Sequence, residues 1–273
     1  MKRYGLIGSP ITHSLSPALF EAAYGGVYEY NLIEAADLDE SLRLFQESYQ
    51  AINVTAPYKE SACLKADVRS PECEVIGACN VLQKTEDGVV AANTDYLGVM
   101  KCLIPHYSTG NLKPLTLVVG CGGAAKAAAY AACELGHEVV IINRDFAKAD
   151  YFAQALCERN PLYMVSARPL SEFGRWFRKA GAIVYTLPLA IDTLTSLSRS
   201  EVRGGLFASQ PKVILEANYR NPSFTAEVLS GLRKSNRNIV YISGREWLLH
   251  QAVEAFGIFT GKEPNIPAMM NVI

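Results

Sequence analysis

The sequence predicts an α/β protein built from two α/β domains in succession. Strand-like apolar runs alternate with helix-like runs through the 273 residues, which is typical of sheets with parallel strands. A loop rich in chain-breaking residues, His106–Pro114, interrupts this alternation and is the predicted domain boundary. A second strand–helix series starts directly after it, so we expect one sheet on each side of the loop.

In the first half, the opening residues hold too short an apolar run for a signal peptide and are expected to form a strand. Pro17 suits the first turn of a helix, and Asp37 suits the N-cap of an amphipathic one. The dipeptide Asp87–Gly88 predicts the turn of a hairpin. The predicted elements are strands over 3–8, 27–34 and 51–55, a hairpin over 79–95, and helices over 16–24, 37–49 and 96–105.

The second half repeats the pattern with longer apolar runs. Gly136 is expected to stop its first helix, and the last helix is long and apolar on one side. The predicted strands cover 115–120, 137–143, 181–187, 212–218 and 238–243, and the predicted helices cover 123–136, 145–160 and 245–261.

Composition and charge exclude several classes of protein. The 26 Lys and Arg residues nearly balance 27 Asp and Glu, which argues against a nucleic-acid partner. No apolar stretch approaches the ~20 residues that cross a bilayer. The seven cysteines form no CxxC pair and the four histidines are scattered, so we expect reduced thiols and no metal site. We therefore expect a cytoplasmic protein without nucleic-acid or membrane partners. Composition does not decide between a monomer and a homodimer, and both stay open.

The glycine-rich turn after residues 115–120 predicts a dinucleotide site. Gly120, Gly122 and Ala125 form the pattern G-x-G-x-x-A between a predicted strand and a predicted helix. The next strand ends in neutral Asn143, followed by Arg144, whose guanidinium favours the 2′-phosphate of NADP. The adjacent acidic residue, Asp145, argues in the other direction.

Two hydroxyls precede the first helix. Ser16 is a good N-cap residue, which leaves Ser14 unexplained. Because residues i and i+2 of an extended segment point the same way, both hydroxyls could instead face one small anion at the helix N-terminus. Capping and anion binding both remain open at this point.

Further polar residues follow the predicted strands of the first half. Lys59 and Asp95 each have an ordinary alternative role, since a lysine is often solvated and Asp95 could cap the helix over 96–105. Taken together, these amides, hydroxyls, one amine and one carboxylate suit a hydroxyl-rich ligand that faces a nicotinamide. The set comprises Asn53, Thr55, Lys59, Asn80, Asn93, Thr94 and Asp95.

These motifs together resemble the shikimate dehydrogenases over essentially the whole chain. They occur in that family's order, namely GSPITHSLSP, NVTAPYK, GACNVL, ANTD, GCGGAAKA, NR and GREWLLHQA. The resemblance implies a substrate-binding domain over 1–105, a Rossmann-type NADP-binding domain over 106–245, a cleft between them, and a C-terminal helical segment, 246–273, that returns to the first domain.

The resemblance also implies an activity, the reversible NADPH-dependent reduction of 3-dehydroshikimate to shikimate in aromatic amino-acid biosynthesis. NADP(H) is the expected cofactor, with NAD(H) as the alternative. Two other functions stay open, a quinate/shikimate dehydrogenase that uses NAD or NADP and a non-catalytic NADP-sensing module.

Carried over by position, the family's motifs give each residue an expected role. Lys59 and Asp95 match the catalytic pair. The substrate is expected to contact Ser14, Ser16, Asn53, Thr55, Asn80, Tyr219 and Gln251. The cofactor is expected to contact Gly120, Gly122, Gly123, Ala124, Ala125, Asn143, Arg144, Lys148 and Gly244.

The cofactor half departs from the family pattern at three places. Asp145 replaces a threonine, the loop Tyr185–Ile191 differs from the usual Asn-Ala-Thr-Pro loop, and Trp247 replaces a methionine. The substrate half therefore matches the family better than the cofactor half.

Overall fold

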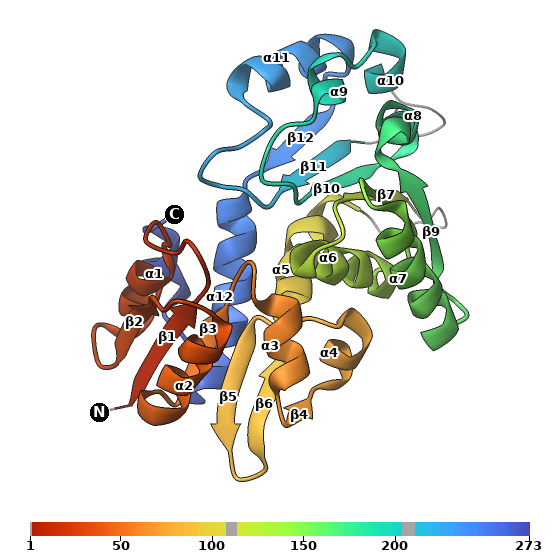
Figure 1. Cartoon of the computed structure of the whole chain (residues 1–273). Coiled ribbons are helices and arrows are strands. Elements are labelled where there is room, and N and C mark those ends of the chain that lie inside the picture. Colours follow the sequence, from red (N-terminus) through yellow and green to blue (C-terminus); the bar gives the residue numbers. More distant parts are fainter. Residues whose placement is uncertain (1, 108–113, 204–210) are drawn as a thin grey trace. The chain divides into compact units, whose positions relative to one another are not determined.

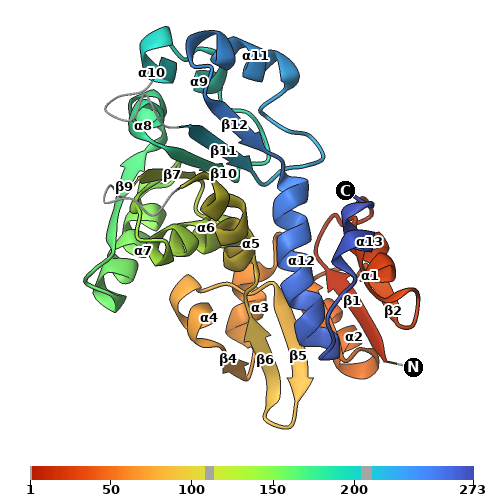
Figure 2. The ribbon, with the colours of Figure 1, turned by 180° about the vertical axis from the view of Figure 1, so that it is seen from behind.

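The computed structural model describes residues 2–107, 114–203 and 211–273. The chain divides into two compact units (Figures 1 and 2). Unit 1 comprises residues 1–98 and 248–273, and unit 2 comprises residues 99–247. Most of the predicted boundary loop, residues 108–113, lies outside the described residues.

Unit 1 is built on a mixed six-stranded sheet with the order β2-β1-β3-β5-β6-β4. Parallel pairing joins β1 to β2 and β3, whereas β5 runs antiparallel to both β3 and β6. The strands are β1 (Arg3–Ile7), β2 (Glu29–Ile33), β3 (Ala51–Val54), β4 (Val68–Arg69), β5 (Val81–Thr85) and β6 (Gly88–Ala92).

The predicted hairpin forms, with its turn shifted by one residue. Thr85 pairs with Gly88, so the turn residues are Glu86 and Asp87 instead of Asp87 and Gly88. Gly88 has a φ of 106°, a left-handed value that favours glycine, and it opens β6.

The helices of unit 1 cover both faces of its sheet. They are α1 (Ser16–Tyr24), α2 (Leu38–Ser48), α3 (Lys59–Lys65), α4 (Pro71–Ile76), the part of α12 (Gly244–Thr260) from Leu248 onward, and α13 (Ile266–Met270). Another helix, α5 (Asp95–Leu103), starts in unit 1 and is followed by a short 3-10 turn, Ile104–His106.

Two apolar cores lie on opposite faces of the unit 1 sheet. Successive residues of a strand point to opposite faces, and Ala51 joins one core while Ile52 joins the other. The first core is aromatic, because α1 and α12 contribute Phe20 and Phe256, whose ring centroids lie 4.8 Å apart. Helix α12 therefore completes a core that β1 and α1 begin.

Unit 2 has a six-stranded sheet in which every strand is parallel to its neighbours, with the order β12-β11-β10-β7-β8-β9. This is the strand order of a Rossmann fold. The strands are β7 (Leu115–Val119), β8 (Glu138–Asn143), β9 (Met164–Pro169), β10 (Ala182–Tyr185), β11 (Lys212–Glu216) and β12 (Ile239–Ile242).

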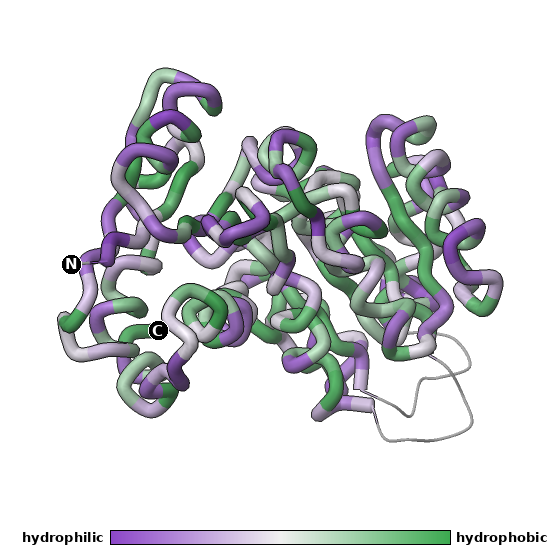
Figure 3. Tube along the Cα trace, turned by 90° about the horizontal axis from the view of Figure 1, so that it is seen from below, coloured by the Kyte–Doolittle hydropathy of each residue, from purple (hydrophilic) through white to green (hydrophobic). Residues whose placement is uncertain are grey.

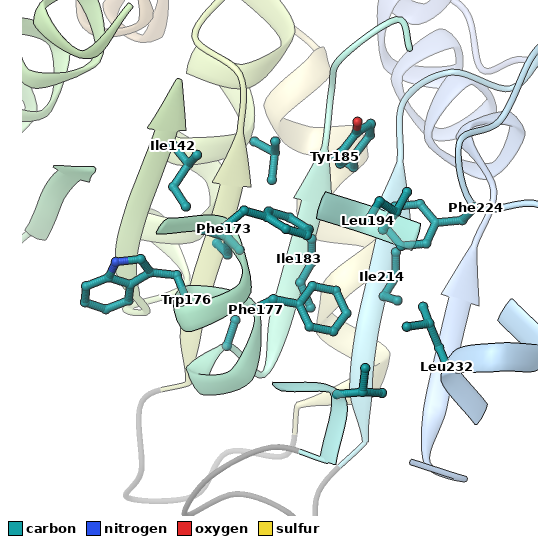
Figure 4. Close-up of a cluster of buried hydrophobic side chains, with 14 of the residues drawn as sticks. Ile142, Phe173, Trp176, Phe177, Ile183, Tyr185, Leu194, Ile214, Phe224 and Leu232 are labelled. Atoms are coloured by element: carbon teal, nitrogen blue, oxygen red, sulfur yellow. The ribbon is translucent and has the colours of Figure 1, made fainter. Parts of the chain in front are cut away.

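On one face of this sheet, the helices α8 to α11, within residues 173–235, pack around a core that includes Phe177, Ile183, Ile214 and Phe224 (Figure 4). Along the helices of the trace, hydrophilic and hydrophobic residues alternate, as expected of amphipathic helices (Figure 3). The helices are α6 (Gly123–Glu134), α7 (Phe146–Arg159), α8 (Phe173–Lys179), α9 (Asp192–Thr195), α10 (Arg199–Arg203) and α11 (Ala226–Ser235), and a 3-10 turn covers Leu170–Glu172. Within the described ranges, no helix has the length and apolar character needed to cross a membrane.

Candidate active site and dinucleotide site

The topology of unit 1 brings its predicted polar residues to the end of the sheet where β1 and β3 have their carboxyl ends. Strand β5 runs the other way and begins there, directly after Asn80. Strand β6 ends there, directly before Asn93. The loops that carry Ser14 and Thr55 start at the same carboxyl ends of the strands, which is where ligands of α/β sheets commonly bind.

Lys59 and Asp95 form an ion pair at this end of the sheet. The Lys59 ammonium donates to Oδ2 of Asp95, and the two side chains are 15% and 7% exposed. Lys59 is the first residue of α3 and Asp95 the first residue of α5. The Cys79 N–H donates to the Lys59 carbonyl at 3.0 Å, which ties the start of α3 to the segment before β5. An ammonium held by a carboxylate in this way can deliver a proton to a neighbouring oxygen.

Asn93, and not Asp95, caps helix α5. Oδ1 of Asn93 accepts hydrogen bonds from the N–H groups of Asp95 at 3.0 Å and of Tyr96 at 3.4 Å. The Asp95 carboxylate instead faces Lys59 and the amide of Asn80, which lies 3.3 Å from Oδ1. The capping alternative for Asp95 is therefore wrong.

Asn80 connects several of the predicted residues. Its Nδ2 lies 2.8 Å from both Thr94 Oγ1 and Gln251 Oε1, and its Oδ1 accepts from the Thr94 N–H at 2.7 Å. Gln251 comes from α12, and its own Nε2 donates to the Leu248 carbonyl at 3.0 Å. The amides of Asn80 and Gln251 are thus oriented by contacts inside unit 1.

The two serines lie together at the start of α1. The Ser16 N–H donates to Ser14 Oγ at 3.2 Å, and the Ser14 hydroxyl donates to Ser16 Oγ at 3.1 Å. Leu15 occupies the N-cap position, without a capping bond from a side chain, so Ser16 is not the N-cap residue. Both hydroxyls are within reach of one small anion, as the second alternative requires.

Asn53 is held by a residue that sequence reasoning missed. Its Oδ1 accepts from the Tyr30 hydroxyl at 2.7 Å, and its Nδ2 donates to the Asn80 carbonyl at 3.1 Å. Burial raises the pKa of Tyr30, so the hydroxyl keeps its proton and can donate. Tyr30 lies on β2, and only the pairing of the strands, which the sequence does not reveal, places it beside Asn53.

The glycine-rich turn of unit 2 has the geometry of a phosphate-binding turn. Gly120 has a φ of 116°, and a Cβ there would collide with Oγ1 of Thr186, whose hydroxyl donates to the Val119 carbonyl at 2.8 Å. At Gly122, which precedes α6, a Cβ would meet nothing within 4 Å, so a ligand can approach the backbone. The backbone N–H groups of the following Gly123, Ala124 and Ala125 open the helix.

At the end of β8, Asp145 has a structural role that the sequence did not assign to it. Its Oδ1 accepts from the Lys148 N–H at 3.0 Å, which makes it the N-cap of α7. Asn143 Nδ2 donates to the Asp145 carbonyl at 2.9 Å. Arg144 lies between them and is exposed.

The remaining predicted residues also follow strand ends of unit 2. Tyr219 comes three residues after β11 and belongs to unit 2, whereas both serines belong to unit 1. Gly244 opens α12, and a Cβ there would lie 2.6 Å from the Glu216 carbonyl oxygen, so close packing requires a glycine. Trp247 is buried. In the described part of the chain, no group of three His, Cys, Asp or Glu side chains is placed to hold a metal ion.

Comparison with known families finds matches at both ends of the chain. Residues 6–82 match the shikimate dehydrogenase substrate binding domain, and residues 244–273 match the shikimate 5'-dehydrogenase C-terminal domain.

Curated relatives extend the likeness to the whole chain. A shikimate dehydrogenase (NADP(+)) from Xanthomonas oryzae pv. oryzae is 30% identical over 97% of this chain and 93% of its own. The enzyme of the same name from Methanocaldococcus jannaschii is 30% identical over 100% and 96%. Against a bifunctional 3-dehydroquinate dehydratase/shikimate dehydrogenase from Arabidopsis thaliana, 28% identical, the chain spans 44% of the relative's length.

Solved structures show the same fold. The shikimate 5-dehydrogenase of Thermus thermophilus, in complex with NADP(H) and shikimate, matches with a TM-score of 0.78 and 27% identity, over 100% of this chain and 98% of that one. The shikimate dehydrogenase of Mycobacterium tuberculosis matches with a TM-score of 0.76 and 30% identity over the same shares.

Proposed function

This chain belongs to the shikimate dehydrogenase family, and from that premise we propose that it catalyses the reversible NADPH-dependent reduction of 3-dehydroshikimate to shikimate in aromatic amino-acid biosynthesis. The observation that carries the proposal is the Lys59–Asp95 pair. Two adjacent serine hydroxyls and several amides lie at the same end of the sheet. A non-catalytic NADP-sensing module has no use for such a pair.

The substrate is assigned to the residues of unit 1. Its carboxylate is placed against the hydroxyls of Ser14 and Ser16, because two donors suit two carboxylate oxygens. The ring and its hydroxyls are assigned to Asn53, Thr55, Asn80 and Gln251. Tyr219 is proposed as an additional donor, as the family resemblance implies.

The residues of unit 2 fit NADP(H). A turn with no side chain at Gly122 admits a pyrophosphate, and the α6 N–H groups supply donors for it. Arg144 is assigned to the 2′-phosphate, with Asn143 and Lys148 beside it. When bound, NADPH supplies the hydride that reduces the ketone carbon.

The chain's own residues supply the proton. As the ketone carbon receives hydride, its oxygen gains negative charge, and the Lys59 ammonium donates one proton to it, which completes the hydroxyl of shikimate. Asp95 holds the ammonium in place through its Oδ2 and is itself oriented by Asn80. In the oxidation direction, neutral Lys59 accepts the proton of the same hydroxyl.

The direct test is turnover of the purified protein with shikimate and NADP+, followed by the absorbance of the NADPH formed. We expect turnover that is faster with shikimate than with quinate and faster with NADP+ than with NAD+. No reduction of either cofactor would refute the proposal, and faster oxidation of quinate would favour the quinate/shikimate alternative.

The serines have a separate test. The double variant Ser14→Ala/Ser16→Ala should lose affinity for shikimate much more than for an analogue without the carboxylate, because a hydrogen bond to a charged group is worth about 1.5–3 kcal/mol. Calorimetric titration with both ligands measures this difference. Equal losses for the two ligands would mean that the serines only support the start of α1.

A cytoplasmic location, without nucleic-acid or membrane partners, is part of the same proposal. It is supported by the net charge of −1 and by seven free cysteines, six of which are buried.

A further inference from the structure

Tyr30 contacts one of the polar residues of unit 1, Asn53, although the family motifs do not include Tyr30. It is part of β2 and pairs in register with Tyr4 of β1. Its hydroxyl donates to Asn53 Oδ1 at 2.7 Å. The phenolic oxygen thus contacts one of the residues that the proposed function assigns to the ring of the substrate.

A short chain of hydrogen bonds starts at Tyr30. The Tyr30 hydroxyl donates to Asn53 Oδ1. Asn53 Nδ2 then donates to the carbonyl of Asn80 at 3.1 Å. The chain runs from Tyr30 to Asn80, the residue whose amide contacts Asp95.

These bonds fix how Asn53 can act on a ligand. The hydroxyl proton of Tyr30 requires an oxygen as its acceptor, and the Asn80 carbonyl requires an N–H as its donor. Both contacts select the same orientation of the amide, which leaves the second N–H of Asn53 for a ligand. Asn53 is therefore set as a hydrogen-bond donor toward an oxygen of the substrate.

We propose that Tyr30 is a positioning residue for substrate binding, which orients the donor amide of Asn53. The inference rests on the proposed function. Tyr30 itself is not assigned a contact with the reacting atoms, and it acts through Asn53. Without its hydroxyl, Asn53 Oδ1 loses its partner, and the amide is less firmly oriented.

The same aromatic core provides a matched control. The Tyr30 ring lies 4.8 Å from that of Phe20 and 5.8 Å from that of Phe256, contacts that the variant Tyr30→Phe retains. The Tyr24 ring packs against the same Phe20 at 5.1 Å, but its hydroxyl donates to the Phe256 carbonyl at 2.9 Å. Tyr24→Phe therefore removes a hydroxyl from this core without touching Asn53 or Ser16.

The first measurement is the dissociation constant of shikimate for the full-length protein, obtained by calorimetry, together with steady-state kinetics. We expect Tyr30→Phe to raise Kd and KM for shikimate by about tenfold, while KM for NADP+ stays within twofold and kcat changes less than KM. Tyr24→Phe should leave Kd for shikimate within twofold. A Tyr30→Phe variant with an unchanged Kd and a lowered melting temperature would overturn the inference and make the hydroxyl purely structural.

The second measurement asks whether Tyr30 acts through Asn53. In the double variant Tyr30→Phe/Asn53→Ala, Kd for shikimate should equal that of Asn53→Ala alone, because the amide that Tyr30 positions is gone. If the double variant instead raises Kd for shikimate by the product of the factors of the two single variants, the coupling is overturned. If the wild-type protein neither binds nor oxidises shikimate, both the proposed function and this inference are overturned. If the wild-type protein turns over shikimate and Tyr30→Phe has the same Kd and KM for shikimate, this inference alone is overturned.

Discussion

At the scale of single residues, the Lys59–Asp95 pair is stable only as a pair. Both side chains are largely withdrawn from water, so removing one partner leaves the other as a poorly solvated charge. The position that suits proton transfer is therefore also one where substitution affects stability. Any test of the chemistry needs a measurement of folding beside it.

Lys59→Ala should lower kcat by roughly 10²–10⁴, the usual contribution of a general acid–base group, while shikimate still binds. The matched control is Lys65→Ala on the same helix, which removes a surface ion pair with Asp39. Steady-state kinetics, calorimetry with shikimate and thermal unfolding should be compared for the two variants. A Lys59→Ala protein that is folded and has nearly the wild-type kcat would exclude Lys59 from proton transfer.

His137 predicts how stability depends on acidity. It is buried beside Thr116, whose Oγ1 lies 2.7 Å from Nδ1, and burial lowers the pKa of His137 to about 4. The unfolded chain binds a proton below about pH 6.5, whereas the folded chain does so only near pH 4. Between these values the unfolded state binds more protons, so stability falls as the pH falls, by about 3 kcal/mol in total.

The measurement is urea unfolding at several pH values between 4 and 7. His137→Gln should flatten this part of the dependence, and substitution of the exposed His13 by Gln should leave it unchanged. An equally steep loss of stability in His137→Gln would assign the dependence to other groups.

The position of the candidate site was easier to predict from the sequence than the local roles of its residues. The motifs and the family resemblance pointed to Lys59 and Asp95, and the structure places them in contact. The capping residues of the helices were harder to predict from the sequence. A shift of one or two residues in the first helical position decides which side chain reaches the free N–H groups. For that reason Ser16 and Asp95 looked like caps, while Asn93 caps α5.

At the scale of elements, the start of α7 combines a cap with the proposed cofactor site. Asp145→Thr removes the charge and keeps a residue type that caps helices well. We expect it to raise the preference for NADP over NAD by about tenfold, or about 1.4 kcal/mol, since a negative charge no longer opposes the 2′-phosphate. Arg144→Ala should abolish the preference.

The values of kcat/KM with NADP+ and NAD+ for the wild type and the two variants decide the matter. Asp145→Ala, which also loses the cap, is the control for helix stability. A wild-type preference for NAD+, or no change in Asp145→Thr, would contradict this account of the strand end.

Elements with long apolar runs were predictable, and exposed or short ones were not. The five predicted strands of unit 2 form, but the sixth strand, β9, was missed because it lies at the sheet edge, begins with exposed Met164 and ends in a proline. In unit 1, the short helices α3 and α4 carry too few turns for a clear period. The mixed pairing of that sheet was equally hidden, and with it the position of Tyr30.

At the scale of the whole molecule, the part of α12 from Leu248 onward belongs to the core of unit 1. Phe256→Ala should therefore cost about 3–5 kcal/mol and weaken shikimate binding, although the residue is far from Ser14 and Asn53 in sequence. Phe177→Ala is matched in burial but lies in the core of unit 2, so it should affect binding of NADP+ more.

Unfolding curves and titrations with both ligands test the comparison. The opposite pattern, or equal effects of the two variants on both ligands, would contradict the assignment of one ligand to each unit.

The chain path of unit 1 also sets an order of events during synthesis. Residues 99–247 form a continuous segment, so unit 2 can fold as soon as they leave the ribosome. The strands β1 to β3 emerge earlier, yet the aromatic face that includes Tyr4 and Phe20 lacks Phe256 and Phe259 until α12 has been synthesised. Unit 1 is thus begun before unit 2 and completed after it, and its apolar face is the surface that a chaperone would meet on the unfinished chain.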